Sequence, residues 1–308
     1  MTYPTNIPIC IGTRTVSEML KHRWTRVKNG FETPLEFLAL CFDKAMQKYF
    51  KRNSRLRRKL FAKHMMKKMQ SLGYVKSNHF DFKGIKIPML DKKTNEDFFN
   101  AMFEDDYYIY LFENDNYEEK FMDKYYYLLI EGPFCFKNEL VDVQVKPGDV
   151  VIDVGSWIGD FAAYASVKGA TTYAFEPSNN LFQVLKKTAS LNPNIIPVEK
   201  AVGNETISNS KIGGVFDTTA NEKFDITTLD DFVSENKLTH VDFIKADIEG
   251  FERHMLEGAQ ETLKNFAPKL ALCTYHLPDD PEILAKLIKK ANPNYKIVQK
   301  RMKLFATV

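Results

Sequence analysis

The sequence lacks the features that mark a membrane-spanning, secreted or disulfide-stabilised protein. It has no run of 18 apolar residues, so no transmembrane helix is predicted. The first twenty residues show no basic start followed by an apolar stretch, which argues against a secretory signal. The four cysteines are far apart and form no CxxC pair, a spacing that predicts reduced thiols and no zinc ribbon. These absences predict a cytoplasmic protein.

Two motifs that the sequence lacks argue against particular classes of enzyme. The chain has neither the G-x-G-x-x-G motif of dinucleotide binders nor the H-E-x-x-H motif of zinc proteases. It also has no internal repeat. What it does have is the composition of a globular protein, with 44% hydrophobic, 13% aromatic and 27% charged residues. Its 308 residues suffice for a catalytic domain together with a smaller region.

The positive charge is concentrated near the N-terminus. Residues 21–76 contain 16 Lys or Arg and three acids, a local balance of +13, whereas the whole chain carries only +3. Apolar residues at helical spacing predict basic amphipathic helices over 37–50 and 54–72. Such a surface is either a solvated helix face or a peripheral contact with an anionic membrane or glycolipid. Nucleic acid is less favoured, because no recognisable nucleic-acid module accompanies the charge.

Three segments follow: a basic, mostly helical region over 1–76, an aromatic-rich connecting or cap region over 77–147, and an α/β domain over 148–308. In the last segment, short apolar runs alternate with amphipathic ones, as in a mainly parallel, doubly wound sheet. A less regular stretch over 203–227 predicts a hairpin around Gly213 and Gly214. Strands are predicted at 150–154, 172–175, 195–199, 241–246, 270–274 and 295–299. Helices are predicted at 159–167, 181–191, 229–235, 251–265 and 282–290.

The first strand of this domain leads into a turn that suits a nucleoside-bearing cofactor. Gly155 allows a tight turn and close approach of a ligand, and Gly159 lets the next helix begin close to the sheet. Asp153 ends a hydrophobic strand, where an unpaired carboxylate is costly. It either caps the turn or faces a cationic or amine-bearing ligand. Glu176 follows Gly155 by 21 residues and ends the second strand, a position suited to two ribose hydroxyls. The alternative is that Glu176 merely opens the next helix.

Charged residues also end the fourth and fifth strands. Lys245 and Asp247 alternate onto one face, and Glu249 joins them if the extended geometry continues. Lys245 either pairs with a carboxylate or contacts a ligand, and Asp247 with Glu249 are candidate ligands for Mg²⁺. His276 follows the fifth strand and is a candidate general base, although a lone histidine is more often structural.

Four stretches together resemble the FkbM-type family of S-adenosylmethionine-dependent methyltransferases. The resemblance covers about residues 131–308 and fits best in the segment Ile244–Glu252, preceded by residues 228–232. The turn at 151–161, the segment 173–178, and the tail 275–280 with 292–296 carry the rest. The resemblance implies a Rossmann-like, mainly parallel methyltransferase sheet with an antiparallel last strand. It also implies S-adenosyl-L-methionine as cofactor and methyl transfer to a hydroxyl of a sugar, glycan or glycolipid precursor.

The resemblance also implies roles for individual residues. Asp153, Gly155 and Gly159 shape the methionine side of the pocket, and Glu176 holds the ribose. The other implied cofactor-binding residues are Ser156, Trp157, Pro177, Ser178, Ala201, Val202 and Asp247. Ser156 and Trp157 stand where the family often has Ala-Asn, and the indole face of Trp157 can lie near the sulfonium.

The implied chemistry is in-line displacement at a methyl carbon, with a base removing the acceptor proton. His276 is the first candidate for that base, with Asp247 or Glu249 as base or metal ligand next. The alternatives are a non-catalytic nucleoside-binding scaffold and a methyltransferase of RNA, protein or small metabolites. A nicotinamide-dependent oxidoreductase is the weakest alternative.

Overall fold

The computed structural model describes residues 70–71, 73–82, 84–89, 134–210, 223–300 and 302–308. The basic helices predicted over 37–50 and 54–72 lie almost wholly outside the described residues, as do Gly213 and Gly214 and much of the region 77–147. The described residues from Tyr74 onward belong to one compact unit. Within these ranges, each helix is too short or too polar to cross a bilayer.

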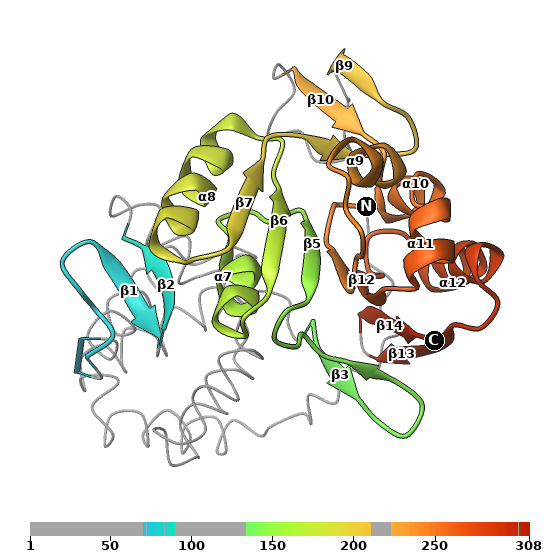
Figure 1. Cartoon of the computed structure of the whole chain (residues 1–308), viewed down its shortest axis with the longest axis horizontal. Coiled ribbons are helices and arrows are strands. Elements are labelled where there is room, and N and C mark those ends of the chain that lie inside the picture. The colour runs from blue at the N-terminus through green and yellow to red at the C-terminus, as the bar shows by residue number, and fades with distance from the viewer. Residues whose placement is uncertain (1–69, 72, 83, 90–133, 211–222, 301) are drawn as a thin grey trace, which may run out of the picture. The chain divides into compact units, whose positions relative to one another are not determined.

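A seven-stranded sheet forms the centre of this unit, in the order β13-β14-β12-β11-β5-β6-β7 (Figure 1). Five strands run parallel, and β14 runs antiparallel to both β12 and β13. The expected parallel sheet with an antiparallel last strand is therefore confirmed. Its strands are β5 (Val150–Val154), β6 (Thr171–Phe175), β7 (Ile195–Val198), β11 (Phe243–Ala246), β12 (Lys269–Cys273), β13 (Lys296–Lys300) and β14 (Lys303–Thr307).

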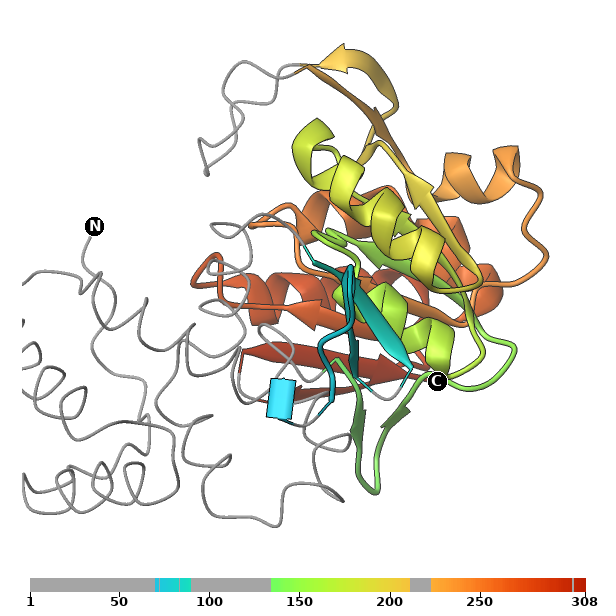
Figure 2. The same ribbon diagram turned by 90° about the vertical axis from the view of Figure 1, so that its left-hand side faces the viewer.

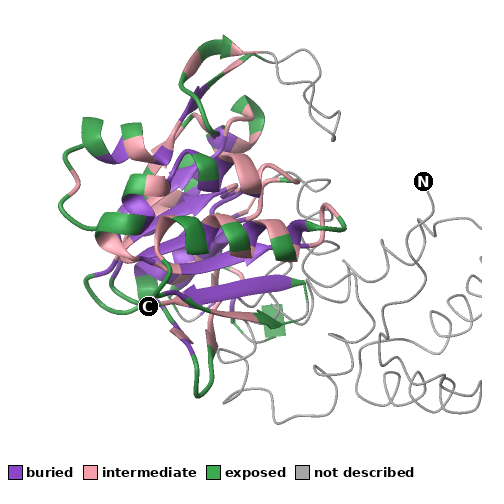
Figure 3. Cartoon of the chain, turned by 90° about the vertical axis from the view of Figure 1, so that its right-hand side faces the viewer, coloured by how far each residue is buried: buried purple, intermediate pink, exposed green. Residues whose placement is uncertain are grey.

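Helices cover both faces of the sheet (Figure 2). The helices α7 (Asp160–Val167) and α8 (Asn179–Leu191) lie on one face. The other face carries α9 (Leu229–Glu235), α10 (Glu252–Glu257), α11 (Gln260–Phe266) and α12 (Asp280–Ala291). Nearly all residues of the inner strands β5, β11, β12 and β14 are buried, while the helices also carry exposed residues (Figure 3). This two-sided burial explains why the strands read as continuous apolar runs.

The single helix predicted over 251–265 is wrong, because the chain forms α10 and α11 with a break at Gly258. A Cβ on Gly258 would lie 2.2 Å from the carbonyl oxygen of Gly203, so only glycine allows this approach. The Gly258 carbonyl accepts from the Asp230 N–H at 3.0 Å, and the Asp230 carboxylate in turn accepts from the N–H of Thr262 at 2.8 Å. Contacts with α9 therefore end one helix and cap the next.

The end of the chain forms a hairpin where the sequence predicts one strand over 295–299. The second strand, β14, inserts between β12 and β13. Its register places Lys303 opposite Cys273 and Leu304 opposite Leu272. β14 begins with a buried lysine and its burial does not alternate, so its sequence pattern alone does not mark a half-buried strand.

Smaller strands surround the sheet. The hairpin of β1 (His79–Phe82) and β2 (Ile85–Pro88) packs against α7 and α8, and the amide of Asn192 bonds both the N–H and the carbonyl of Lys86. A second short hairpin joins β3 (Phe136–Lys137) and β4 (Asp142–Val143). Beside β8 (Ala201–Val202), the strands β9 (Ile207–Ser210) and β10 (Phe224–Thr227) pair antiparallel, as the hairpin predicted over 203–227 requires.

Candidate active site

The turn after β5 is fixed by backbone contacts to two neighbouring strands. Gly155 has a φ of +74°, and a Cβ there would lie 2.0 Å from the carbonyl oxygen of Asp247. Its N–H donates to the Phe175 carbonyl at 3.1 Å. Gly159 also has a positive φ, and a Cβ there would lie 2.7 Å from Leu185. Both glycines are thus required by packing between segments of this chain.

Glu176 lies at the end of β6 and spans this turn. Its Oε2 accepts from the Trp157 N–H at 3.0 Å, and its Oε1 accepts from the Ser178 N–H at 2.9 Å. Burial raises the pKa of Glu176 to about 7, against the opposing effect of the two backbone hydrogen bonds. An ionised carboxylate has about four acceptor positions, so each oxygen keeps one for a further donor.

Asp153 and Lys245 form a buried ion pair across the sheet. They are neighbours in the register of β5 and β11, and their charged atoms are 3.1 Å apart. Lys245 Nζ also donates to the Gly155 carbonyl at 2.6 Å. Although burial lowers the pKa of Lys245, the carboxylates of Asp153, Asp247 and Asp160 together raise it above its usual value. Asp153 is therefore connected through Lys245 to the turn that follows β5.

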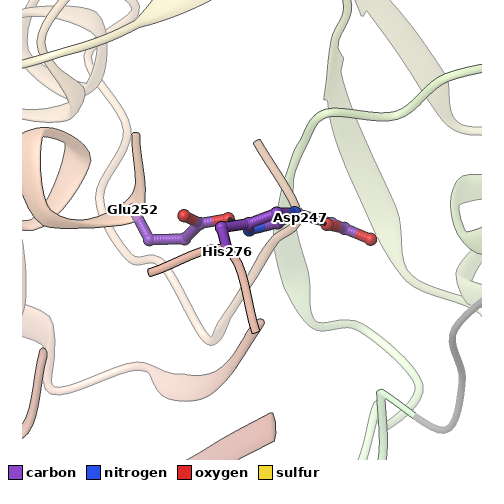
Figure 4. Close-up of side chains that lie close together, drawn as sticks. All are labelled: Asp247, Glu252 and His276. Carbon is purple, nitrogen blue, oxygen red and sulfur yellow. Dashed lines mark ion pairs between the residues drawn. The ribbon is translucent and has the colours of Figure 1, made fainter. Parts of the chain in front are cut away.

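A second charged cluster lies where β11 and β12 end, and Figure 4 shows its three central side chains. His276 lies between Asp247 and Glu252. Its Nε2 is 3.6 Å from Asp247 Oδ1 and 3.3 Å from Glu249 Oε2, and its Nδ1 is 3.2 Å from Glu252 Oε1. The Tyr275 hydroxyl donates to Asp247 Oδ1 at 3.1 Å. Two loops thereby bring one imidazole against three carboxylates.

Glu252 holds the loop after β11 in its unusual shape. It is fully buried and accepts from the N–H groups of Ile248 at 2.8 Å and Gly250 at 3.0 Å. In this loop, Glu249 and Gly250 have positive φ values of 58° and 94°. A non-glycine residue in this region is strained, and such strain persists only where surrounding contacts enforce it. Glu252 supplies those contacts and presents Glu249, whose side chain is 56% exposed, to the outside.

The surroundings of His276 determine its charge. Burial alone lowers the pKa of its ring, but Glu249, Glu252 and Asp247 outweigh burial and raise it to about 10. At neutral pH the ring is an imidazolium, which can donate a proton but not accept one. In this arrangement Asp247 and Glu249 are better placed than His276 to accept the proton of a substrate hydroxyl. That His276 is the base stays a prediction.

The same cluster gives a test of the predicted magnesium site. Donor atoms of Asp247, Glu252 and His276 lie within 4.8 Å of one another, and Glu249 is not in this set. Mg²⁺ prefers an octahedron of oxygen ligands. Here only two of the three donors are carboxylates, the third is a protonated imidazole, and the fully buried Glu252 has its Oε1 3.2 Å from that ring. The residues do not fit Mg²⁺.

The other predicted cofactor-binding residues lie along the same edge. The Ser156 hydroxyl donates to the Asp153 carbonyl at 2.8 Å, and the side chain of Trp157 is partly exposed. Ala201 and Val202 form β8, and Val202 is part of the apolar core. Pro177 lines a pocket between the ends of β6 and β7 and the start of β10. Ser178 is the N-cap of α8. The pocket is lined by Pro177, Asn179, Glu199, Lys223, Phe224 and Asp225.

Sequence reasoning assigned no role to Glu252 or Tyr275, although both stand in the segments that carry the resemblance. A glutamate two residues after a glycine is typical of an ordinary helix start, and nothing in the local sequence shows that Glu252 is buried. Arg253 is similar: it bonds Asp279 at 2.9 Å and Asp280 at 2.6 Å, which ties α10 to the loop that carries His276. Apart from the bonds of Glu252 to its own loop, these roles depend on contacts between segments more than 20 residues apart.

Sheet order, the antiparallel β14 and a charged edge next to a glycine turn define the class: a Rossmann-like methyltransferase fold. Residues 153–297 match the methyltransferase FkbM domain, which confirms the resemblance. The match covers just under half of the chain, and this part is thus similar to FkbM-type methyltransferase domains.

Three relatives illustrate the match. The hexuronic acid methyltransferase AglP of Haloferax volcanii is 27% identical over 165 residues, which are 51% of this chain and 68% of that protein. The 31-O-demethyl-FK506 methyltransferase FkbM of Streptomyces tacrolimicus is 37% identical over 68 residues, 19% of this chain and 26% of that protein. The crystal structure of methyltransferase FkbM from Methylobacillus flagellatus KT aligns with a TM-score of 0.46 and 21% identity, over 71% of this chain and 56% of that chain. The chain thus spans about a quarter of the second relative and just over half of the third.

Proposed function

We propose that this protein transfers a methyl group from S-adenosylmethionine to an oxygen atom of a sugar, in a glycan or glycolipid precursor. The observation that carries the proposal is the pairing of two sites at one sheet edge. Glu176 can accept from a diol, and the cluster of Asp247, Glu249 and His276 can manage a proton. The names of two relatives point the same way, since one acts on a hexuronic acid and the other methylates an oxygen of FK506.

The residues of the first two strand ends suit the cofactor. Glu176 keeps one acceptor position on each oxygen for the ribose hydroxyls, while its bonds to Trp157 and Ser178 fix its direction. Lys245 holds the Gly155 carbonyl and so fixes the turn. When bound, S-adenosylmethionine supplies an electrophilic methyl group on a sulfonium.

The cluster of Asp247, Glu249 and His276 would carry out the proton transfer. A sugar hydroxyl is a weak acid, so a base must take its proton as the new carbon–oxygen bond forms. We assign this to Asp247, because its carboxylate is partly exposed at the edge and is held by the Tyr275 hydroxyl. The His276 imidazolium, 3.6 Å away, stabilises the negative charge of that carboxylate before the transfer. Glu252 positions the ring and does not reach the substrate.

The first experiment is calorimetric titration of the purified protein with S-adenosylmethionine, S-adenosylhomocysteine and NAD. We expect the two sulfur nucleosides to bind and NAD not to bind. Binding of NAD alone would overturn the proposal. Transfer of labelled methyl to methyl glycosides of glucose and glucuronic acid then tests the acceptor. Alkali-stable product is an ether and alkali-labile product is an ester, so one treatment separates hydroxyl from carboxylate methylation.

The base assignment has its own test. Asp247→Asn should lower kcat by about 10²–10³-fold, the usual contribution of a general base, while S-adenosylmethionine affinity stays within about threefold. Glu249→Gln is the matched control, since this carboxylate also lies close to His276 but is more exposed. High activity of Asp247→Asn with loss in Glu249→Gln would move the base to Glu249. Loss only in His276→Gln would restore the histidine.

A further inference from the structure

Lys303 is a buried cation at the start of β14. Its residue is only 4% exposed, and its Nζ lies 4.5 Å from the centroid of the Phe134 ring. Among the described residues, no carboxylate lies within ion-pair distance of it and no acceptor is within hydrogen-bond distance. A buried ammonium without a counter-charge is costly, and an aromatic face compensates only part of that cost. An anionic ligand group beside Lys303 would lower that cost.

Lys245, a second buried lysine near the same ring, differs from Lys303 in its partners. Its Nζ lies 5.0 Å from the centroid of the same Phe134 ring, and its side chain is equally buried. Yet Lys245 has the Asp153 carboxylate at 3.1 Å and the Gly155 carbonyl at 2.6 Å. Two ammonium groups thus share one aromatic ring, and only one of them has a carboxylate partner among the residues that the structure describes.

The place of Lys303 in the sheet connects it with the site. It is opposite Cys273, at the carboxyl end of β12, and the next residue on β12's side, Thr274, donates its N–H to the Met302 carbonyl at 2.9 Å. The loop with Tyr275 and His276 follows directly. Through Phe134 and Lys245, the same cation is linked to the turn at Gly155. A ligand at this edge is therefore within the neighbourhood of Lys303.

We propose that Lys303, seated on the Phe134 ring, binds a carboxylate group of a bound ligand. An ammonium–carboxylate hydrogen bond is charge-assisted and supplies the missing counter-charge. Two carboxylates can fill it: the amino-acid end of S-adenosylmethionine, or an acidic sugar acceptor. The second source rests on the proposed function, whereas the first requires only the cofactor.

The test compares Lys303→Met with Lys296→Met in the full-length protein. Methionine keeps the length of the lysine side chain and removes its charge. Lys296 lies on the same hairpin but is exposed and at its other end, so it is the matched control. Calorimetry measures S-adenosylmethionine against 5′-methylthioadenosine, which lacks the carboxylate. A second pair, with S-adenosylhomocysteine bound, measures glucuronate against glucose.

If Lys303 binds the carboxylate of the cofactor, Lys303→Met weakens the binding of S-adenosylmethionine by about 10- to 100-fold and leaves the binding of methylthioadenosine unchanged. If Lys303 binds the carboxylate of the acceptor, the Lys303→Met change weakens the binding of glucuronate by a similar factor and leaves the binding of glucose and of both nucleosides unchanged. If neither carboxylate binds more weakly to Lys303→Met than to the wild type, the proposal is overturned. The nucleoside comparison decides the role of Lys303 even if the wild type methylates no sugar, so the two proposals fail separately.

A melting curve excludes a merely structural role. Removing a buried, unpaired charge should leave the melting temperature unchanged or raise it by about 2–4 °C. A lysine that serves the fold would show the opposite: lower melting temperature, with both ligand pairs weakened alike. That result would also overturn the proposal.

Discussion

Glu176 and Glu252 are two buried carboxylates with almost the same backbone contacts and different surroundings. Each accepts two N–H groups from the loop beside it, at 2.9 and 3.0 Å for Glu176 and 2.8 and 3.0 Å for Glu252. Only Glu252 also has a cation, the His276 ring at 3.2 Å. The presence of that cation separates a carboxylate that organises the fold from one that can receive a ligand.

A buried glutamate that accepts two backbone N–H groups thus occurs twice at one edge of the sheet, once with a cation beside it and once without. Glu252 is satisfied inside the chain and fixes the strained loop of Glu249 and Gly250. Glu176 is buried without a paired cation, so burial raises its pKa to about 7 and its remaining acceptor positions stay available. The predictions below test the link between these two regions and then each region by itself.

The largest effect is expected from Gly155→Ala, which forces apart the two loops. The new methyl group would lie 2.0 Å from the Asp247 carbonyl, at a φ of +74°. Steric overlap and left-handed strain together should cost about 3 kcal/mol or more in the free energy of unfolding. Gly148→Ala is the control, because its φ is +85° but nothing lies within 4 Å. Urea denaturation should show a cost of about 1 kcal/mol there. Equal costs would mean that the loop contact is unimportant.

Glu252→Gln should reduce stability by about 2–4 kcal/mol, because it leaves the buried imidazolium without its carboxylate and turns one acceptor into a donor. Glu257→Gln removes a glutamate that also faces a histidine, His254 at 3.4 Å, but on the surface. Its effect should stay within about 0.5 kcal/mol. Chemical denaturation of both variants measures the difference. Similar values would show that Glu252 does not organise the loop.

Glu176→Gln should weaken S-adenosylmethionine binding by about 10- to 30-fold, the value of one hydrogen bond to a charged group, with little loss of stability. Glu205→Gln, at an exposed position after β8, is the control and should bind normally. Calorimetry measures both. Unchanged affinity in Glu176→Gln would remove Glu176 from the cofactor site.

A smaller effect is expected from pH. Since burial raises the pKa of Glu176 to about 7, this carboxyl is mostly protonated at pH 6 and ionised at pH 8. The ionised form accepts both ribose hydroxyls, so S-adenosylmethionine affinity should rise by up to about tenfold over this interval. The folded pKa is raised, so the contribution of Glu176 to stability is full at low pH and is lost as pH rises through about 7. A rise of the same size in Glu176→Gln would assign it to another group.

The smallest expected effect is that of metal ions. Because the cluster offers only two carboxylates beside a protonated His276, Mg²⁺ added to chelator-treated protein should give no binding heat and no shift in melting temperature. Micromolar Mg²⁺ binding that disappears in Asp247→Asn would contradict this and would make Asp247 a ligand.

Much of the fold was predictable from local pattern. The apolar runs fix β5, β6, β11 and β12, because a strand buried on both faces needs apolar side chains at nearly every position. The break at Gly258 was not predictable, since it depends on the close approach of Gly203. The strand β14 was missed because its apolar run, Leu304 to Ala306, is only three residues long and lies between a lysine and a threonine.

The sequence by itself determined the order of most strands and helices, the two positive-φ glycines of the first turn and the position of Glu176 at a strand end. These follow from residue type and spacing, which act over a few residues. The tertiary structure decided which charges meet: Asp153 with Lys245, His276 with three carboxylates, and Lys303 with no carboxylate of the described part of the chain. Ion pairing and pKa depend on burial and on distances of a few ångströms between segments far apart in the chain, and only packing sets those.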